Sequence, residues 1–235
     1  MSTVVWTQSL DEELDAMRWV LEEVAAGRPV PAAEAKAIVQ SLHVSMHATP
    51  ELSLQLVQMR LPSDYNATHA LNVSMLAMAT TESTGHSGEE VLHVGLAGLL
   101  HDIGTVFTPT EILTKTEPLN EQERSTLKQH PVLGARAVIS SEDNLDLPAI
   151  VAYEHHVRLD GGGYPAFKYP RDAHTASRLI QICDVFDAMR TPRPYKKAWP
   201  DEMAVSFIEE RAGFEFHPEL ARDFVRMVRA VLKVA

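Results

Sequence analysis

Histidine and aspartate stand together in this chain at the end of a strongly apolar segment. His101 and Asp102 close the stretch VLHVGLAGLLHD (91–102), just before Gly104. A lone carboxylate buried beside such a segment is costly unless another group compensates its charge. An arginine or a helix cap could compensate it, and so could a metal ion. An isolated pair of this kind is more often structural than catalytic.

The same two residue types recur on other predicted helices. His69 and Asp184 each lie on a face that apolar residues otherwise occupy, and His130 is expected to end a helix. His155 and His156 are adjacent, immediately before a glycine-rich loop. One histidine on an apolar face is most simply a hydrogen-bonded core residue. Only the histidines and aspartates taken together indicate a metal site.

Five histidines and two aspartates from separate helices, with no cysteine among them, form a ligand set suited to Fe, Mn, Zn, Ni or Co. They are too many for one tetrahedral zinc ion. Asp102 has two carboxylate oxygens and could bridge two ions. Because spacing alone does not show that these side chains converge, a binuclear site inside a helical bundle is a hypothesis at this point.

The elements that must position these side chains are helices nearly throughout. Apolar residues recur at helical spacing, and alternating strand-like patterns are scarce. Asn120 and Glu123 form a capping-box pattern for a helix that ends near His130. The sequence therefore predicts an all-α fold. The other predicted helices cover about 8–26, 32–47, 50–60, 66–80, 90–103, 132–140, 147–157, 173–189, 200–212 and 217–233.

Composition and charge narrow the class of protein. The chain has 235 residues, with 21 Lys and Arg against 32 Asp and Glu and a net charge of -11. So acidic a chain is a poor binder of nucleic-acid polymers or anionic membranes, which both require a basic surface. The single cysteine, Cys183, excludes an internal disulfide and a thiolate zinc site. Because no segment has the pattern of a signal peptide or a membrane span, we expect a cytoplasmic protein without membrane insertion.

Pro62 is the expected boundary between two parts of the chain. Residues 1–61 would form a helical appendage for dimerisation, regulation or linkage, and residues 62–235 hold nearly all candidate site residues. The helix at 8–26 has an apolar stripe that must be covered, by residues 61–235 or by a second copy of the chain. We predict a homodimer through this stripe. The alternative is that the appendage packs onto the rest as part of one core.

An ordered series of short motifs adds a resemblance to a known family. HDIG (101–104) is followed by HP (130–131), HH (155–156), DGGGYP (160–165), DVFDA (184–188) and RPY (193–195). Over about residues 64–230 the chain resembles the HD-GYP family, a branch of the HD phosphohydrolase superfamily. The resemblance implies an all-helical HD-type bundle with two or three metals, commonly iron or manganese, and hydrolysis of cyclic di-GMP.

The resemblance also assigns the ligands residue by residue. It implies that His69, His101, Asp102 and Asp184 hold one metal ion, and that Asp102, His130, His155 and His156 hold the other. Family members with a third metal carry a Glu one helical turn before the first histidine, where this chain has Tyr65. We therefore expect two divalent ions, iron or manganese, with zinc, nickel or cobalt as alternatives.

Charge suggests how such a site would work. Two divalent ions would invert the local potential of an acidic protein and lower the pKa of a bridging water. The resulting hydroxide would attack phosphorus in line with the departing ribose oxygen. The predicted activity is a metal-dependent phosphodiesterase that converts cyclic di-GMP to linear pGpG, GMP or both. An HD hydrolase of another cyclic dinucleotide or nucleotide is an alternative.

Two segments are basic islands in this acidic chain, RLDGGGYPAFKYPR (158–171) and TPRPYKK (191–197). The resemblance associates Arg193 and Lys196 with ligand phosphate or guanine. Glycines allow backbone N–H groups to approach a ligand closely, although a rigid solvated turn would also explain them. The loop is also a candidate surface for a protein partner. The candidate substrate-binding residues of the glycine-rich loop in 158–171 are Gly161, Gly162, Gly163 and Tyr164.

Two positions depart from the family pattern. Thr105 stands where typical members have the lysine of HDIGK, and Asn72 where they carry an arginine. Thr105 can act as a catalytic hydrogen-bond donor but brings no charge, so turnover is expected to be low. A degenerate module that binds cyclic di-GMP or a partner protein is therefore a further alternative. His93 lies two turns before His101 on the same face and is most simply a core residue. The other five histidines show no partner pattern, namely His43, His47, His86, His174 and His217.

Overall fold

The computed structural model describes residues 10–48, 65–141, 144–167, 171–192 and 197–232. Within these ranges the chain is helical, without a β-strand, and has isolated bridges only at Val157–Gly163 and Ala212–Phe216. The prediction of an all-α fold is confirmed. The helix predicted over 50–60 and the boundary at Pro62 lie outside the described residues.

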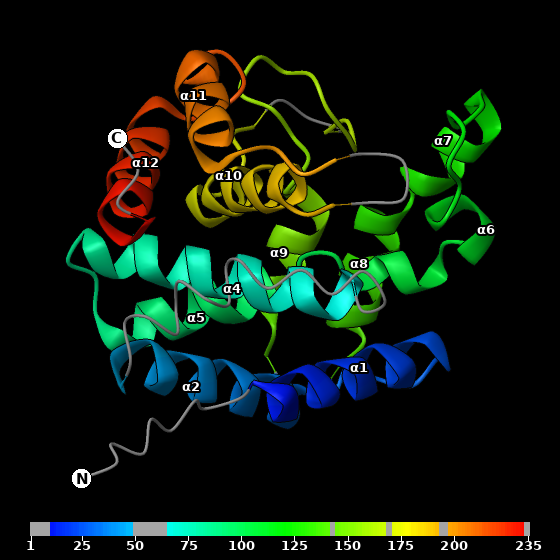
Figure 1. The fold of residues 1–235 in the computed structure, drawn as a ribbon. Coiled ribbons are helices and arrows are strands. Elements are labelled where there is room, and N and C mark those ends of the chain that lie inside the picture. Colours follow the sequence, from blue (N-terminus) through cyan, green and yellow to red (C-terminus); the bar gives the residue numbers. More distant parts are fainter. Residues whose placement is uncertain (1–9, 49–64, 142–143, 168–170, 193–196, 233–235) are drawn as a thin grey trace, which may run out of the picture.

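The central helices are arranged in layers (Figure 1). α1 (Asp11–Ala25) and α2 (Ala32–Ala48) form one outer layer, and α4 (Tyr65–Ser83) and α5 (Gly88–Leu100) form the middle layer. α10 (Thr175–Arg190) lies across the opposite side of α4 and α5. The middle layer is therefore covered on both sides, and polar side chains that it buries need partners from within the bundle.

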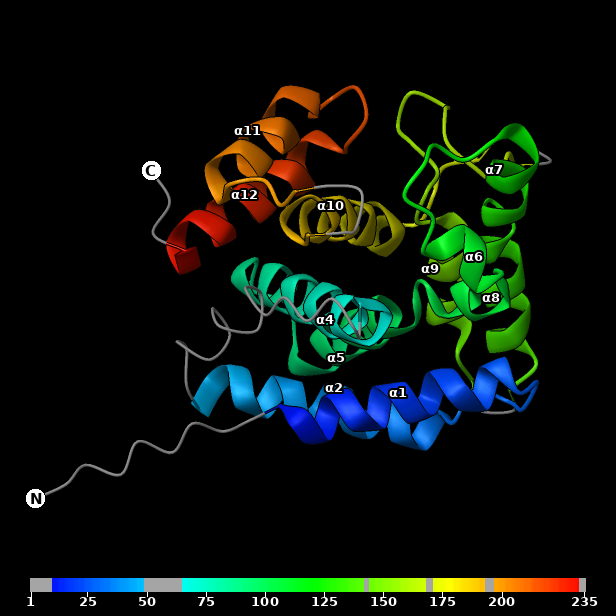
Figure 2. The same ribbon diagram turned by 45° about the vertical axis from the view of Figure 1, so that its right-hand side comes forward.

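Shorter helices close one end of these layers (Figure 2). The chain passes from α5 through η2 (Ile103–Phe107), α6 (Thr110–Leu113) and α7 (Glu121–Leu127), and then into α8 (His130–Ile139) and α9 (Asp146–Glu154). α8 packs on both η2 and α9, and α9 packs on α5 and α10. This end of the bundle therefore brings together the ends of several helices.

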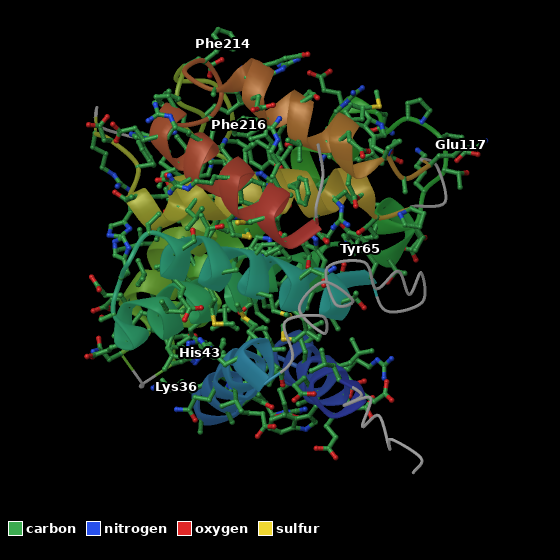
Figure 3. The ribbon with its side chains drawn as sticks, turned by 60° about the vertical axis from the view of Figure 1, so that its left-hand side comes forward. Lys36, His43, Tyr65, Glu117, Phe214 and Phe216 are labelled. Atoms are coloured by element: carbon green, nitrogen blue, oxygen red, sulfur yellow. The ribbon has the colours of Figure 1, made fainter. Side chains whose placement is uncertain are left out.

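The last two helices, α11 (Asp201–Arg211) and α12 (Pro218–Leu232), pack on α10 and on each other. The turn between them directs Phe214 outward and buries Phe216 (Figure 3). Phe216 joins a hydrophobic cluster with Phe186 and Phe224. This cluster packs α11 and α12 against α10.

The apolar stripe of α1 is covered within one chain. Leu14, Met17 and Val20 are buried, in one cluster with Leu71 of α4 and Leu99 of α5. The first two helices therefore pack onto the rest as part of one core, and the predicted homodimer loses the observation on which it rested.

α5 is apolar because it lies in the core. The segment Gly88–Phe107 is long and apolar enough to cross a membrane by length and composition, and it is the one such segment in the described ranges. Most of it is buried against other helices of the bundle. A core helix meets the same criteria.

The start of α8 corrects one expectation. Asn120 caps α7 as predicted, with its Oδ1 accepting from the Glu123 N–H at 2.9 Å. α7 ends at Leu127, however, so His130 begins α8 and does not end the preceding helix. Pro131 occupies the first turn of α8, where a missing N–H costs nothing.

Gly104 permits a close contact between η2 and α8. A Cβ atom at Gly104 would lie 2.0 Å from the His130 carbonyl oxygen and 2.5 Å from the Gly134 nitrogen. No such approach is compatible with a side chain. The glycine of the HDIG motif therefore lets the segment that carries Asp102 rest directly on the helix that begins with His130.

Replacement of Gly104 by alanine should separate these two segments. We expect Gly104→Ala to lower the free energy of unfolding by about 1–3 kcal/mol or more, because the added methyl group overlaps backbone atoms that cannot rotate away. Gly88→Ala is the matched control, since nothing lies within 4 Å of its Cβ position. Urea unfolding of both variants checks the prediction, and equal midpoints would contradict it.

Candidate metal centre

The bundle brings together all seven residues proposed from the sequence as metal ligands. His130 is the first residue of α8, and His155 caps the end of α9. Five of the seven side chains are buried, while Asp102 and His156 are partly accessible. The residues are His69 of α4, His101 and Asp102 after α5, His130 of α8, His155 and His156 after α9, and Asp184 of α10.

The histidines fall into two groups whose nitrogen and oxygen atoms lie close together. One group contains His69, His101 and Asp102, and the other contains His130, His155 and His156 (sets whose atoms all lie within 4.8 Å of one another). Asp102 reaches the second group as well, because its Oδ1 lies 3.1 Å from His130 Nε2 and 3.8 Å from His155 Nε2. Asp102 therefore lies between the two groups.

Asp184 also faces both groups. Its Oδ1 lies 3.2 Å from His69 Nε2, and its Oδ2 lies 3.8 Å from His156 Nδ1. The cluster thus has a carboxylate from the end of α5 and another from α10, with imidazoles between them. Such a set of oxygen and nitrogen donors, without sulfur, suits divalent transition metals.

Backbone carbonyls orient three of the imidazoles. The Nδ1 atoms of His101, His130 and His155 lie 2.7, 2.8 and 3.0 Å from the carbonyl oxygens of Gly98, Leu127 and Ala152. A carbonyl only accepts, so each Nδ1 carries the hydrogen. Each Nε2 is then left with a lone pair directed at the cluster, which is the form that binds a metal.

His69 is oriented by a carboxylate, and the sequence analysis missed the residue that supplies it. Asp187 is fully buried, and its Oδ2 accepts from His69 Nδ1 at 2.7 Å. Asn72 donates to the other oxygen of Asp187 at 2.8 Å, and Thr191 donates to Oδ2 at 3.4 Å. Asn72, which replaces the family arginine, thus holds Asp187. Asp187 follows Asp184 by three residues on one helix face, and this spacing is the signal that could have found it.

Two atoms at the centre of the cluster support an ion there. His101 Nε2 and Asp102 Oδ1 are buried without a hydrogen-bond partner in the described part of the chain. A buried acceptor without a partner costs about 1–3 kcal/mol. Both atoms belong to residue types that bind divalent cations, so the residues present fit a metal centre.

Burial and charge separate the pKa values of these groups. Burial alone lowers the pKa of His69, but hydrogen bonds to Asp184 and Asp187 outweigh it and raise the pKa to about 10. Burial lowers the pKa of His156 to about 4 and also depresses the pKa of His155. Most of the cluster is therefore neutral imidazole at pH 7, while His69 carries a proton.

The two carboxyl groups are ionised. Burial by itself would raise the pKa of Asp102, but His130 and the neighbouring imidazoles hold it well below its usual range. The same opposition applies to Asp184, whose pKa is lowered chiefly by its hydrogen bond from His69. Two buried negative charges with one protonated imidazole leave the cluster ready to take up cations.

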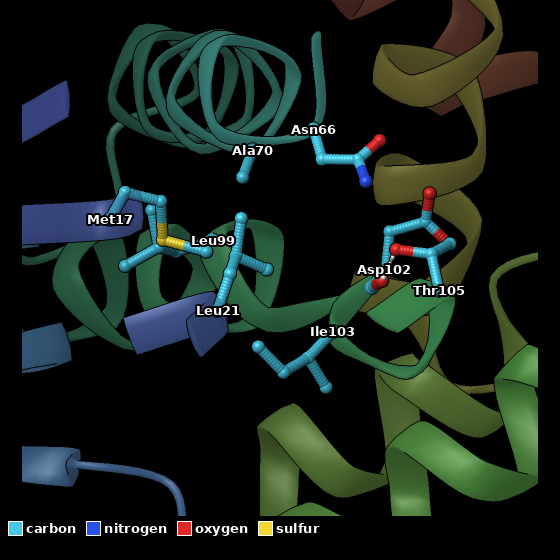
Figure 4. A pocket seen from close by; sticks show the side chains of 8 residues that line it. All are labelled: Met17, Leu21, Asn66, Ala70, Leu99, Asp102, Ile103 and Thr105. Carbon is cyan, nitrogen blue, oxygen red and sulfur yellow. Dashed lines mark hydrogen bonds between the residues drawn. The ribbon is translucent and has the colours of Figure 1, made fainter. Parts of the chain in front are cut away.

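Thr105 lies at the edge of this cluster with its hydroxyl already engaged. Its Oγ1 donates to the Asp102 carbonyl at 2.7 Å. It also lines a pocket with Asn66 and Asp102 on one side and Met17 and Leu21 of α1 on the other (Figure 4). A longer side chain at position 105 would therefore enter this pocket, which Asp102 also lines.

The glycine-rich loop folds back on itself. The Gly161 amide donates to the Arg158 carbonyl, and the Gly162 amide donates to Asp160. A Cβ at Gly163, which has a φ of +82°, would lie 1.9 Å from the His156 carbonyl oxygen. Two of these amides thus serve the turn, and the loop fixes the backbone of His156. Contacts of these glycines with substrate stay a prediction.

Aromatic rings cover the imidazoles on two sides. The Tyr164 ring lies 4.5 Å from the His156 ring, and Lys128 Nζ lies 5.4 Å from the Tyr164 ring. Lys128 is exposed and was not singled out from the sequence. Tyr65 stacks on His69 at 5.2 Å, in the position expected for a third-metal glutamate. Arg193 and Lys196 lie outside the described residues.

The bundle and its interior histidine–aspartate cluster define a helical domain of the HD type. The family model described as the HD domain matches residues 51–220. This chain belongs to the HD domain family, and the resemblance of its motifs to the HD-GYP branch is confirmed.

Similar proteins extend this result. A cyclic di-GMP phosphodiesterase of Pseudomonas aeruginosa is 32% identical over 209 residues, which cover 89% of this chain and 50% of that protein. A 3'3'-cGAMP-specific phosphodiesterase of Vibrio cholerae is 31% identical over 153 residues, or 65% of this chain and 29% of that protein. The chain therefore spans half or less of these curated relatives.

A solved structure shares the fold. A HDG"Y"P protein from Bdellovibrio bacteriovorus superposes with a TM-score of 0.76 at 14% sequence identity. The superposition covers 99% of this chain and 75% of that chain. At this identity the likeness concerns the fold, and it includes the helices before residue 51.

Replacement of Asp187 should weaken metal binding without removing a ligand. We expect Asp187→Asn to lower metal affinity by about 10–100-fold, because the substitution removes the negative charge that orients and polarises His69. Asp223→Asn, which changes a partly exposed aspartate paired with Arg226, is the control. Competition with a chromophoric chelator measures both affinities. If the two variants bind metal equally well, Asp187 does not orient a ligand.

Metal binding should release a proton at neutral pH. His69, with a pKa of about 10, must lose its proton before Nε2 can bind a metal, so apparent affinity should rise with pH up to that value. Calorimetric titrations at pH 7.5, in two buffers with different ionisation enthalpies, should give about one proton released per chain. A release of zero would show that His69 is neutral in the metal-free protein or is not a ligand.

Proposed function

We propose that this chain is a metal-dependent phosphodiesterase that hydrolyses cyclic di-GMP to linear pGpG, GMP or both. The observation that carries the proposal is the convergence of imidazole Nε2 atoms whose Nδ1 atoms are fixed by backbone carbonyls. The order of the motifs and the name of the Pseudomonas relative support the substrate. The buried free thiol of Cys183 is compatible with a cytoplasmic setting.

Two divalent ions are proposed, with iron or manganese as the metal. A mixed imidazole and carboxylate set without thiolate suits both metals. When bound, the ions would supply positive charge to a phosphodiester and make water acidic enough to lose a proton near neutral pH. His69, His101, Asp102 and Asp184 would hold one ion, and Asp102, His130, His155 and His156 the other.

The chain's own residues would guide an anionic substrate toward this centre. Lys128 is an exposed cation beside the ring of Tyr164, which in turn lies against His156. We propose that Lys128 contacts a substrate phosphate and contributes part of the charge that Thr105 lacks. Arg193 and Lys196 stay predicted contacts, as does a protein partner at the loop 160–165.

Two alternatives have specific support. Thr105 and Asn72 are uncharged, and their side chains already donate hydrogen bonds to Asp102 and Asp187. Neither side chain therefore offers a positive charge to the substrate. This favours slow turnover or a module that binds without hydrolysis. The Vibrio relative named as specific for 3'3'-cGAMP supports a second cyclic dinucleotide as substrate.

Single-turnover assays of Thr105 variants test the proposal. We expect wild type loaded with reduced iron or with manganese to hydrolyse cyclic di-GMP slowly and in preference to 3'3'-cGAMP. Thr105→Lys should raise kcat without changing metal content, by at most about 10²–10³-fold, the typical value of one oriented donor in a transition state. Thr105→Val is the matched control, because it keeps the shape and removes only the hydroxyl.

The same assays distinguish the alternatives. Binding of cyclic di-GMP without product from either wild type or Thr105→Lys would favour the binding module. Faster turnover of 3'3'-cGAMP than of cyclic di-GMP would show that 3'3'-cGAMP is the preferred substrate. If wild type turns over as fast as a relative that carries the motif lysine, and Thr105→Lys is no faster, Thr105 is not a handicap.

A further inference from the structure

A second group of potential metal ligands lies outside the candidate metal centre. His43 and His47 lie one helical turn apart on α2, and Glu82 is near the end of α4. Glu82 follows His69 by 13 positions, which corresponds to about 20 Å along an α-helix. Figure 3 shows His43 toward the opposite end of α4 from Tyr65. The two groups are therefore separate.

The hydrogen bonds of His47 fix which nitrogen faces Glu82. His47 Nδ1 lies 2.8 Å from the His43 carbonyl oxygen, which can only accept, so Nδ1 carries the hydrogen. His47 Nε2 lies 2.6 Å from Glu82 Oε1. In the neutral imidazole both of these atoms are acceptors, and they would repel each other. A cation must therefore stand between them, either a proton on Nε2 or a metal ion.

The arrangement repeats one found in the candidate metal centre. His130 also directs Nδ1 to a backbone carbonyl and Nε2 to a carboxylate, at 2.8 and 3.1 Å. A carbonyl behind the imidazole is the usual way in which proteins orient a metal-binding histidine. His43 adds a third donor, since its ring lies 4.5 Å from that of His47 and the three ligand atoms lie within 4.8 Å of one another.

We propose that His43, His47 and Glu82 bind one divalent transition-metal ion of the zinc class. Two imidazoles and a carboxylate form a three-ligand set, to which water adds the fourth position of a tetrahedral ion. The side chains of His47 and Glu82 are 50% and 42% exposed, so water has access. No covalent chemistry is assigned to the ion.

An ion at this place would join α2 to the end of α4. α2 belongs to the layer contributed by the first two helices, and α4 carries His69 of the candidate metal centre at its other end. Because the ion would bind the folded arrangement and not the unfolded chain, it would stabilise the packing of this layer in proportion to its concentration. The site would thus make attachment of the first two helices dependent on metal.

Zinc content of matched variants tests this proposal. The test compares four proteins, the wild-type chain of 235 residues and its variants His47→Gln, Glu82→Gln and His86→Gln. Each is dialysed against the same buffered free Zn²⁺ and analysed for zinc. His86 is an exposed histidine that contacts Thr84, so it controls for loss of any surface imidazole. We expect wild type and His86→Gln to hold about one Zn²⁺ per chain more than the other two variants.

The readout does not depend on the proposed phosphodiesterase. Ions in the candidate metal centre are common to all four proteins and cancel in the difference. Zinc should also raise the thermal midpoint of wild type and His86→Gln more than that of His47→Gln and Glu82→Gln. Equal zinc content and equal thermal shifts in all four proteins would overturn the proposal and identify the contact as a protonated imidazole paired with a carboxylate.

Discussion

The candidate metal centre depends on hydrogen bonds that hold each buried imidazole with one ring nitrogen facing the other ligands. A neutral histidine can present a lone pair at only one nitrogen, and the hydrogen bond made by the other decides which. Backbone carbonyls make that choice for His101, His130 and His155, and Asp187 makes it for His69. The bonds of His101 and His155 join each ring to the end of its own helix, and the bond of His130 joins the start of α8 to the last residue of α7. The backbone itself therefore sets the orientation of these ligands.

Packing then brings these helix ends together. The glycine contact between Gly104 and the backbone of α8 places Asp102 beside His130, and α10 lies across α4 so that Asp184 meets His69. Metal affinity and fold stability are therefore coupled. His101 Nε2 is a buried acceptor without a hydrogen-bond partner among the described residues, which weakens the metal-free protein, and a bound cation would satisfy it.

Helical spacing was sufficient to predict the all-α fold. The convergence of the seven side chains could be predicted only from the family resemblance that the ordered series of motifs carries. The sequence was not sufficient for contacts that depend on how helices pack. The hydrogen bonds of Asp187 to His69 and Asn72 exist only because α10 packs on α4. Glu82 likewise contacts His47 only because α2 lies against the end of α4. The prediction that His130 ends a helix was wrong, because Pro131 belongs to the first turn of α8 and His130 begins that helix.

Elemental analysis of wild type and Asp102→Ala tests the central claim most directly. Asp102 lies between both histidine groups, so its removal should affect every ion in the centre. After supplementation with iron, manganese or zinc, the account predicts about two ions at this centre in wild type and their loss in Asp102→Ala, with the fold retained. A wild type that is fully folded and metal-free after the same supplementation would contradict it.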